Sequence, residues 1–240
     1  MEIRAELIKS HDRVWQFLAR PGAWFTGAQR VALVSEFRFA RQCGLCQKQK
    51  SSLSPGTVNG DHEFEISWLS PSQVEIIHKL ANDPGRITRS WVEARLADGV
   101  EDVEYVEIAG IVSAACVVDT FHVALGMSLR PLPDPVAGAP SKERPRTAID
   151  CGAFVPMIPV DGLADDYEDL YDTRHWVPNV HRAFSLVPGV TRIANDLMRT
   201  HYFEYELVPR YLDKDHGYAI NKMQIELVAS RVSIYNDCFY

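Results

Sequence analysis

The sequence predicts an all-α protein. Apolar residues recur at helical spacing in most segments, and the strict alternation that marks a half-buried strand is nearly absent. Helix start and stop signals divide the chain, among them Thr26, Ser70-Pro71 and Gly126. The hydrophobic fraction of 46% and the charged fraction of 24% are ordinary for a globular protein, which argues against global disorder.

Residues 1–128 are expected to form one helical unit. Its last helix, from Asp102 to Leu125 with Gly126 as C-cap, is apolar all round between Ile108 and Val118, which predicts a buried core helix. That apolar stretch is far shorter than the roughly 20 residues that cross a bilayer, so no membrane association is expected. The other helices of this unit are expected to start at Ser10, at Thr26, at Ser70-Pro71, and at Thr88 or Ser90.

Residues 129–174 are expected to form a connector, and residues 175–240 a second, shorter helical unit. Five prolines between Leu129 and Gly152 break any regular structure in the connector. Helical spacing returns after it and predicts helices at Val180–Leu186, Gly189–Tyr202 and Lys222–Tyr240.

Charge and cysteine content restrict the environment and the partners. The formal net charge of −7 and the lack of any basic run argue against a nucleic-acid partner. Met1 to Ser10 carries no apolar signal core, and five cysteines are an odd number, which argues against a secreted disulfide scaffold. A cytoplasmic protein is therefore expected. No phosphate loop or nucleotide fingerprint is present, so no cofactor is expected.

The motif Cys43-Gly44-Leu45-Cys46 is the clearest carrier of chemistry. Thiols three positions apart lie on one side of a helical turn, close enough to form a disulfide. In a reducing cytosol such a pair serves redox chemistry or metal binding, or is inert packing. Cys43 and Cys46 with His62 and His122 would make a chemically sensible zinc set.

A second cysteine segment lies at the C-terminal end. The stretch 224–240 resembles the active-site segment of the alkylhydroperoxidase-D and carboxymuconolactone decarboxylase superfamily. That family's pattern is Glu, eleven residues, Cys, two residues, Cys, three residues, His, and Glu226 and Cys238 have the matching separation. The second cysteine would fall directly after Tyr240. We therefore expect the natural protein to continue with a cysteine there and a histidine four residues later.

The resemblance covers most of the chain. Residues 28–127 resemble one complete unit, and residues 176–240 resemble the front part of another, closest to the peroxidase-related branch. Near each end of the chain, an amphipathic helix is followed by a cysteine, Cys43 in one case and Cys238 in the other, which suggests a partial internal duplication. The family implies an alkylhydroperoxidase-D-like helical bundle and a homo-oligomer.

The first unit departs from the family's proton relay. The position twelve before Cys43 is Val31 instead of Glu, and the position four after Cys46 is Lys50 instead of His. Glu36 lies seven residues before Cys43, which returns to nearly the same helix face, so it offers a substitute for the missing Glu. Lys50 could stabilise a thiolate by its charge.

The resemblance implies a thiol-dependent peroxidase or disulfide oxidoreductase. Cys46 would attack a small-molecule peroxide, Cys43 would resolve the sulfenic acid as a disulfide, and an external thiol or disulfide reductant would reset the pair. The alternative is a catalytically degenerate member that acts as a metal-binding or protein-interaction module, which the departures around Cys43 favour. The candidate catalytic residues are Cys43, Cys46, Glu36, Glu226 and Cys238.

Overall fold

Apart from one isolated bridge, the regular secondary structure in the part of the chain that the structure describes is helical, which confirms the all-α prediction. The structure is a computed structural model, and it describes residues 3–163, 165–171, 177–202, 207, 210, 213, 217–236 and 238. Within these residues, extended backbone pairs only at an isolated bridge between Ile149 and Met157.

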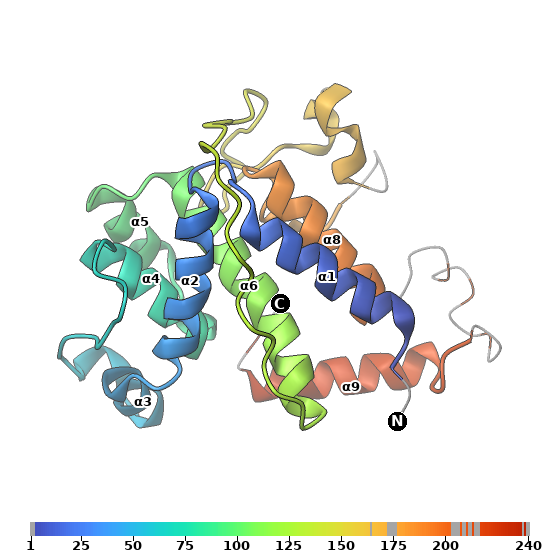
Figure 1. Cartoon of the computed structure of the whole chain (residues 1–240), viewed down its shortest axis with the longest axis horizontal. Helices are drawn as coiled ribbons and strands as arrows, with labels where there is room; N and C mark the ends of the chain where they lie inside the picture. Colours follow the sequence, from blue (N-terminus) through green and yellow to red (C-terminus); the bar gives the residue numbers. More distant parts are fainter. Residues whose placement is uncertain are drawn as a thin grey trace.

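Helix α6 (Asp102–Ala124) lies at the centre of the molecule (Figure 1). Helices α2 (Gly27–Ala40) and α4 (Pro71–Asn82) pack on one side of it, and α1 (Ala5–Ala19) and α8 (Pro188–His201) pack on the other. The remaining described α-helices are α3 (Gly44–Ser51), α5 (Arg89–Ala97), α7 (Asn179–Arg182) and α9 (Lys222–Tyr235).

Polar caps fix the start of three helices at the predicted places. Thr26 and Ser70 each accept a hydrogen bond from the backbone N–H three residues on, and the glutamine there accepts one from the backbone N–H of the cap. Thr88 caps α5 by accepting from the backbone N–H of Trp91. Each cap satisfies donors that the first helical turn leaves without partners.

Three predicted helix boundaries are wrong. Helix α1 begins at Ala5, and Ser10 is buried inside it, where its hydroxyl donates to Asp196 of α8 over 2.6 Å. The predicted helix 180–186 is the short α7, which ends at Arg182. Helix α9 ends at Tyr235 instead of Tyr240, and Tyr240 lies outside the described residues.

Helix α6 is the core helix that its apolar composition predicts. Nearly every residue from Val103 to Ala115 is buried. By length and composition α6 is apolar enough to cross a membrane, but two thirds of its most apolar window lies buried inside the fold (67%). Its hydrophobicity therefore fits the centre of a helical core.

The contact between α6 and α8 depends on Gly110. A Cβ atom built at Gly110 would lie 2.1 Å from Cγ1 of Val190, which is itself 2% exposed. Gly110→Ala is therefore expected to lower the free energy of unfolding by about 1–3 kcal/mol through overpacking. Val190→Ala in the same chain should restore much of the loss. Urea denaturation of both variants measures this, and a single variant as stable as the parent would contradict the contact.

The α1–α8 contact contains a histidine pair, of which one member is buried. His11 is fully buried, and its Nε2 lies 2.9 Å from Nε2 of His201. Burial, helped by the neighbouring His201, His122 and Arg130, lowers the pKa of His11 from 6.5 to about 4. The fold therefore prefers the neutral imidazole.

This shift predicts a pH-dependent stability. Between about pH 6.5 and 4 the unfolded chain binds a proton at His11 that the folded chain does not, so the fold loses roughly 2–3 kcal/mol as the pH falls through that range. His11→Gln should lose less over the same interval, because the carboxylates that also titrate there are common to both proteins. Urea denaturation at pH 7, 5 and 4 compares the two slopes, and parallel slopes would contradict the shift.

The proline-rich segment lies along α1 without forming a helix. The backbone N–H of Val136 donates to Ala19 O, and those of Ser141 and Lys142 donate to Gly22 O and Ala23 O. The indole N–H of Trp15 donates to Pro131 O. These bonds attach the connector to the end of α1.

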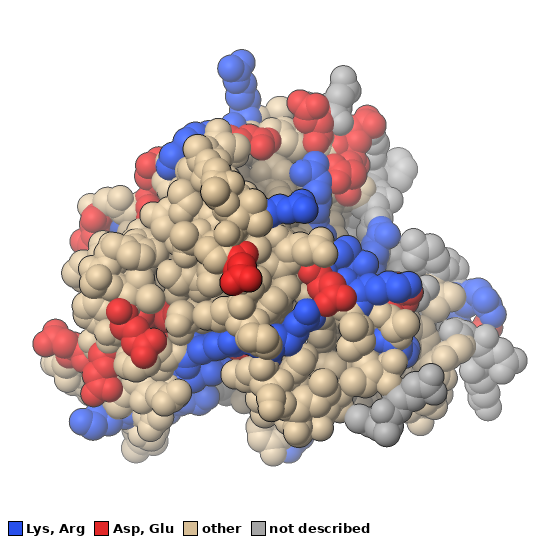
Figure 2. Space-filling view, in the orientation of Figure 1, with Lys and Arg blue, Asp and Glu red and all other residues tan. Residues whose placement is uncertain are grey.

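Acidic and basic side chains are interspersed over the face in Figure 2. Ion pairs between them cross element boundaries, as in Arg13–Asp196 and Arg130–Asp12, both with N···O distances of 2.7 Å. Most of these pairs are partly exposed, so each contributes little to stability.

Candidate functional site

Two thiols and two imidazoles meet between α3 and α4. The potential ligand atoms of Cys43, Cys46, His62 and His78 all lie within 4.8 Å of one another. Cys43, Cys46 and His78 are buried, and the side chain of His62 is 11% exposed. Polar groups that are buried in this way each need a hydrogen-bond partner within the protein.

The start of α3 places both thiols. Cys43 is the N-cap of this helix, and its backbone carbonyl accepts a hydrogen bond from the N–H of Gln47. Cys46 follows within the first helical turn, which brings its sulfur to the same side as that of Cys43. A thiol at a helix N-terminus faces free backbone N–H groups, which favour its thiolate.

His62 comes from the loop after α3 and contacts both sulfurs. Its Nδ1 lies 3.5 Å from Sγ of Cys43 and 3.5 Å from Sγ of Cys46. Its Nε2 donates to Oε2 of Glu75 over 2.7 Å. The other oxygen of Glu75 accepts a hydrogen bond of 3.1 Å from the indole of Trp91 on α5, so this carboxylate is held in place.

His78 comes from the buried face of α4. Its Nδ1 lies 3.4 Å from Sγ of Cys46, and its Nε2 lies 3.0 Å from Oε1 of Glu36. Oε2 of Glu36 accepts the backbone N–H groups of Glu65 and Ile66 over 2.9 and 3.0 Å. Because a carboxylate accepts, Nε2 of His78 carries the proton, and Nδ1 presents a lone pair to Cys46.

The two thiols differ in acidity. Burial opposes ionisation of Cys43, but the backbone N–H of Cys46, the imidazole of His62 and the backbone N–H of Glu63 together lower the pKa of its thiol. Burial raises the pKa of Cys46, and the contact with His62 offsets only part of this effect. Cys43 is therefore the better thiolate of the pair.

The two imidazoles also have pKa values shifted in opposite directions. Burial opposes the charge on His62, but hydrogen bonds to Cys46, Glu75 and Cys43 raise its pKa to about 10. Burial lowers the pKa of His78, although Glu36 acts against this. The contact with His62 also lowers the pKa of Glu75. A protonated His62 thus contacts both sulfurs, and a neutral His78 contacts Cys46.

The structure places three of the five candidate residues together. Cys43 and Cys46 form the cluster, and Glu36 contacts it through His78. Glu226 lies on α9, where it pairs with Lys222 and accepts from Tyr202, and Cys238 is exposed after that helix. Neither belongs to the cluster around Cys43.

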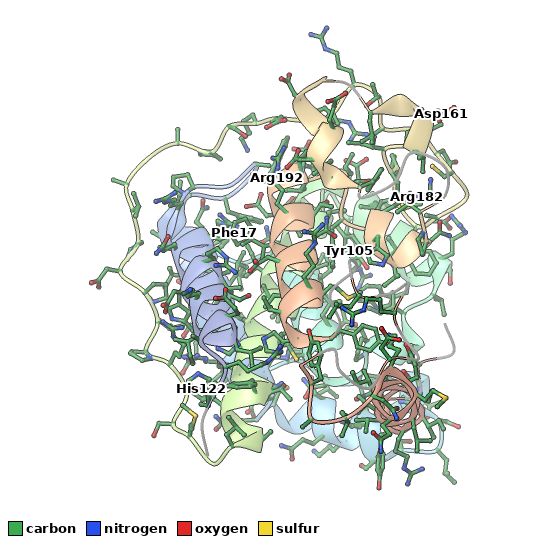
Figure 3. The ribbon with its side chains drawn as sticks, turned by 90° about the vertical axis from the view of Figure 1, so that its right-hand side faces the viewer. Phe17, Tyr105, His122, Asp161, Arg182 and Arg192 are labelled. Carbon is green, nitrogen blue, oxygen red and sulfur yellow. The ribbon has the colours of Figure 1, made fainter. Side chains whose placement is uncertain are left out.

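The predicted fourth zinc ligand, His122, lies elsewhere. It sits near the end of α6 (Figure 3), and its Nδ1 donates to Ser128 O over 2.8 Å. Lys50, considered as a thiolate partner, is exposed on α3.

Two site residues, His78 and Glu75, were not predicted from the sequence. A signal for His78 was present, because it continues the buried spacing of Val74 and Ile77 on α4 and is itself 0% exposed. A histidine at a core-facing position needs a buried partner, and that requirement identifies it as a candidate. Glu75 carries no comparable signal.

Comparisons with known proteins found no matching family model, no matching curated protein and no matching solved structure.

Proposed function

We propose that this protein is a thiol-dependent oxidoreductase in which Cys43 and Cys46 pass between dithiol and disulfide while reducing a small hydroperoxide. The observation that carries the proposal is the pairing of each thiol with an imidazole whose far nitrogen is bonded to a carboxylate. Each thiol then has a proton-transfer group in contact with its sulfur, which is the arrangement that activates sulfur nucleophiles.

Cys43 is the attacking thiol in this proposal. It caps α3 and contacts His62, and both features favour its thiolate. Cys46 is then the resolving thiol, with His78 positioned to take its proton. The family resemblance assigns these two roles in the opposite order, so the role of each thiol is part of the test below.

The reaction proceeds in two balanced steps. The Cys43 thiolate attacks one peroxide oxygen, an S–O bond forms, the O–O bond breaks, and the leaving alkoxide takes a proton from His62. The sulfur of Cys46 then attacks the Cys43 sulfenic acid, an S–S bond forms and the S–O bond breaks. The Cys46 proton passes through His78 to the leaving hydroxide, which gives water. A hydroperoxide is reduced to an alcohol and water while the dithiol loses two hydrogens.

Burial favours a small oxidant over a protein disulfide. Cys43 is 0% exposed and Cys46 is 4% exposed, so only a small molecule reaches the sulfurs beside His62. An external thiol or dithiol reductant resets the pair by exchange.

An alkylhydroperoxidase-D-like bundle with a partial internal duplication, and assembly as a homo-oligomer, belong to the same proposal. The all-helical architecture supports it, as does the order of a helix followed by a Cys-x-x-Cys pair at α2 and α3. The two cysteine-bearing ends differ in packing: half of the residues of α2 are buried, whereas α9 has no buried residue among those described.

A peroxide titration tests the proposal. In a chain with Cys116, Cys151 and Cys238 changed to Ser, one equivalent of hydrogen peroxide should remove two hydrogens, and peptide mapping should place the disulfide between Cys43 and Cys46. The same chain with Cys46→Ser should accumulate a sulfenic acid on Cys43 that a dimedone-type reagent traps. Faster trapping on Cys46 in the Cys43→Ser chain would reverse the roles, and sulfinic acid in place of a disulfide would refute the proposal.

Exposed Cys151 supplies the control. A chain that keeps only Cys151 reports how fast an ordinary surface thiol reacts with peroxide. Cys43 should react faster than this reference although it is buried, because its contacts favour the thiolate.

A further inference from the structure

We propose that the reduced cluster is a Cys2His2 zinc site, with the sulfurs of Cys43 and Cys46 and the Nδ1 atoms of His62 and His78 as the four ligands. These four atoms converge on one point from the start of α3, the following loop and α4, and all lie within 4.8 Å of one another. The proposal goes beyond the redox function above and does not rest on it.

The distances between the donors fit a tetrahedral zinc ion. Zinc binds sulfur at about 2.3 Å and imidazole nitrogen at about 2.0–2.1 Å, which at tetrahedral angles places sulfur and nitrogen about 3.5 Å apart. Three sulfur–nitrogen distances in the cluster are 3.5, 3.5 and 3.4 Å. These three sulfur–nitrogen pairs therefore already have the separation that a tetrahedral zinc ion requires.

Hydrogen bonds outside the ligand set orient both imidazoles for metal binding. Glu75 holds Nε2 of His62, and Glu36 holds Nε2 of His78, so each ring turns its Nδ1 toward the sulfurs. Histidine ligands of zinc are commonly held by a carboxylate in this way, which fixes the tautomer and strengthens the ligand. Trp91 and two backbone N–H groups in turn fix the two carboxylates.

The donor set selects the metal. Two thiolates and two imidazoles in a tetrahedron suit zinc, whereas magnesium, calcium and manganese prefer oxygen ligands. The two negative charges of the thiolates also neutralise the charge of a divalent ion in this buried site. Because four protein groups fill the tetrahedron, the site has the closed form of a structural zinc centre, and it would join α3, the loop and α4.

Zinc binding and disulfide formation are alternative states of the same two thiols. The ion needs both sulfurs as thiolates, and a Cys43–Cys46 disulfide offers neither. A hydroperoxide that oxidises the pair would therefore release the metal.

Metal binding by the full-length reduced chain tests the inference. The protein as purified without chelator should contain one zinc per chain by elemental mass spectrometry. Cobalt replacement should give the intense visible absorption of a tetrahedral site and a thiolate-to-metal charge-transfer band. Reduced chain with less than about 0.1 zinc per molecule and no such band after cobalt addition would overturn the proposal.

Substitutions locate the ion. Cys46→Ser and His78→Asn should lose stoichiometric zinc, whereas His122→Asn should keep it. Glu75→Gln changes a half-buried residue that is not itself a ligand, so all four zinc ligands remain. This variant should weaken zinc binding about 10- to 100-fold in a chelator competition. Glu93→Gln, on the exposed face of α5, is the matched control. If the His78 variant fails to fold, the Glu75 pair decides, and equal affinity in that pair would contradict the site.

Peroxide treatment of metal-free chain separates the two proposals. Zinc binding without disulfide formation supports the metal site and refutes the redox function. Disulfide formation in a chain that binds neither zinc nor cobalt supports the redox function and refutes the metal site.

Discussion

His78→Asn is expected to slow closure of the Cys43–Cys46 disulfide by about 10²-fold or more, because the variant removes the group that takes the Cys46 proton. The first step should be little affected, since Cys43 faces His62 instead. Sulfenic acid on Cys43 should therefore persist and become trappable in the variant. Mass spectrometry of metal-free chain, quenched at intervals after peroxide addition, measures both steps.

The matched control is His122→Asn, which changes a histidine that contacts neither sulfur. It should close the disulfide at the parent rate. Glu36→Gln should give an intermediate rate, because it weakens the orientation of His78 without removing the imidazole. A parent rate of closure in His78→Asn would show that His78 takes no part in the reaction.

Glu107→Leu is expected to cause the largest loss of stability, about 3–5 kcal/mol in the free energy of unfolding. Glu107 on α6 is fully buried and lies 3.3 Å from Nε of Arg30 on α2, which is also buried. The carboxylate also accepts the backbone N–H of Trp24 over 2.5 Å. Removal of this carboxylate leaves the Arg30 guanidinium without its counter-charge in the core. Urea denaturation measures the loss.

A double variant separates charge from packing. Arg30→Met combined with Glu107→Leu removes both charges of this pair, so the double variant should be more stable than Glu107→Leu alone. If the double variant is less stable than the single one, the loss comes from packing and from the hydrogen bonds of Arg30 to Phe17 O and Arg20 O.

Local signals predicted much of the fold. Thr26, Ser70 and Thr88 carry their capping information within three residues, and Gly126 adopts the positive φ of 66° that suits a residue just after a helix. The prediction that Ser10 caps a helix was wrong because tertiary packing gives this serine a different role. A serine that bonds to Asp196 on a distant helix has the same local sequence as a cap, and only the packing of α1 against α8 separates the two roles.

Local sequence patterns also predicted part of the site. Helical spacing identified the thiol pair. The reason given for Glu36, a helix face shared with Cys43, is wrong, because α2 ends at Ala40 and Cys43 is the N-cap of α3. Glu36 nevertheless acts through His78, and that link depends on the packing of α2 against α4, which no local pattern encodes. His78 on α4 and His122 on α6 are both histidines at helical positions near apolar residues, so local sequence does not show which of them lies beside the thiols.

The most direct measurement is the protonation of the histidine rings in reduced, metal-free chain. Long-range nitrogen–proton NMR of a histidine-labelled sample at neutral pH should show His78 as the tautomer with a protonated Nε2 and a bare Nδ1, held by Glu36 and facing Cys46. Glu36→Gln should relax that preference. A protonated Nδ1 on His78, or free exchange between its tautomers, would contradict the arrangement on which both the redox chemistry and the zinc site depend.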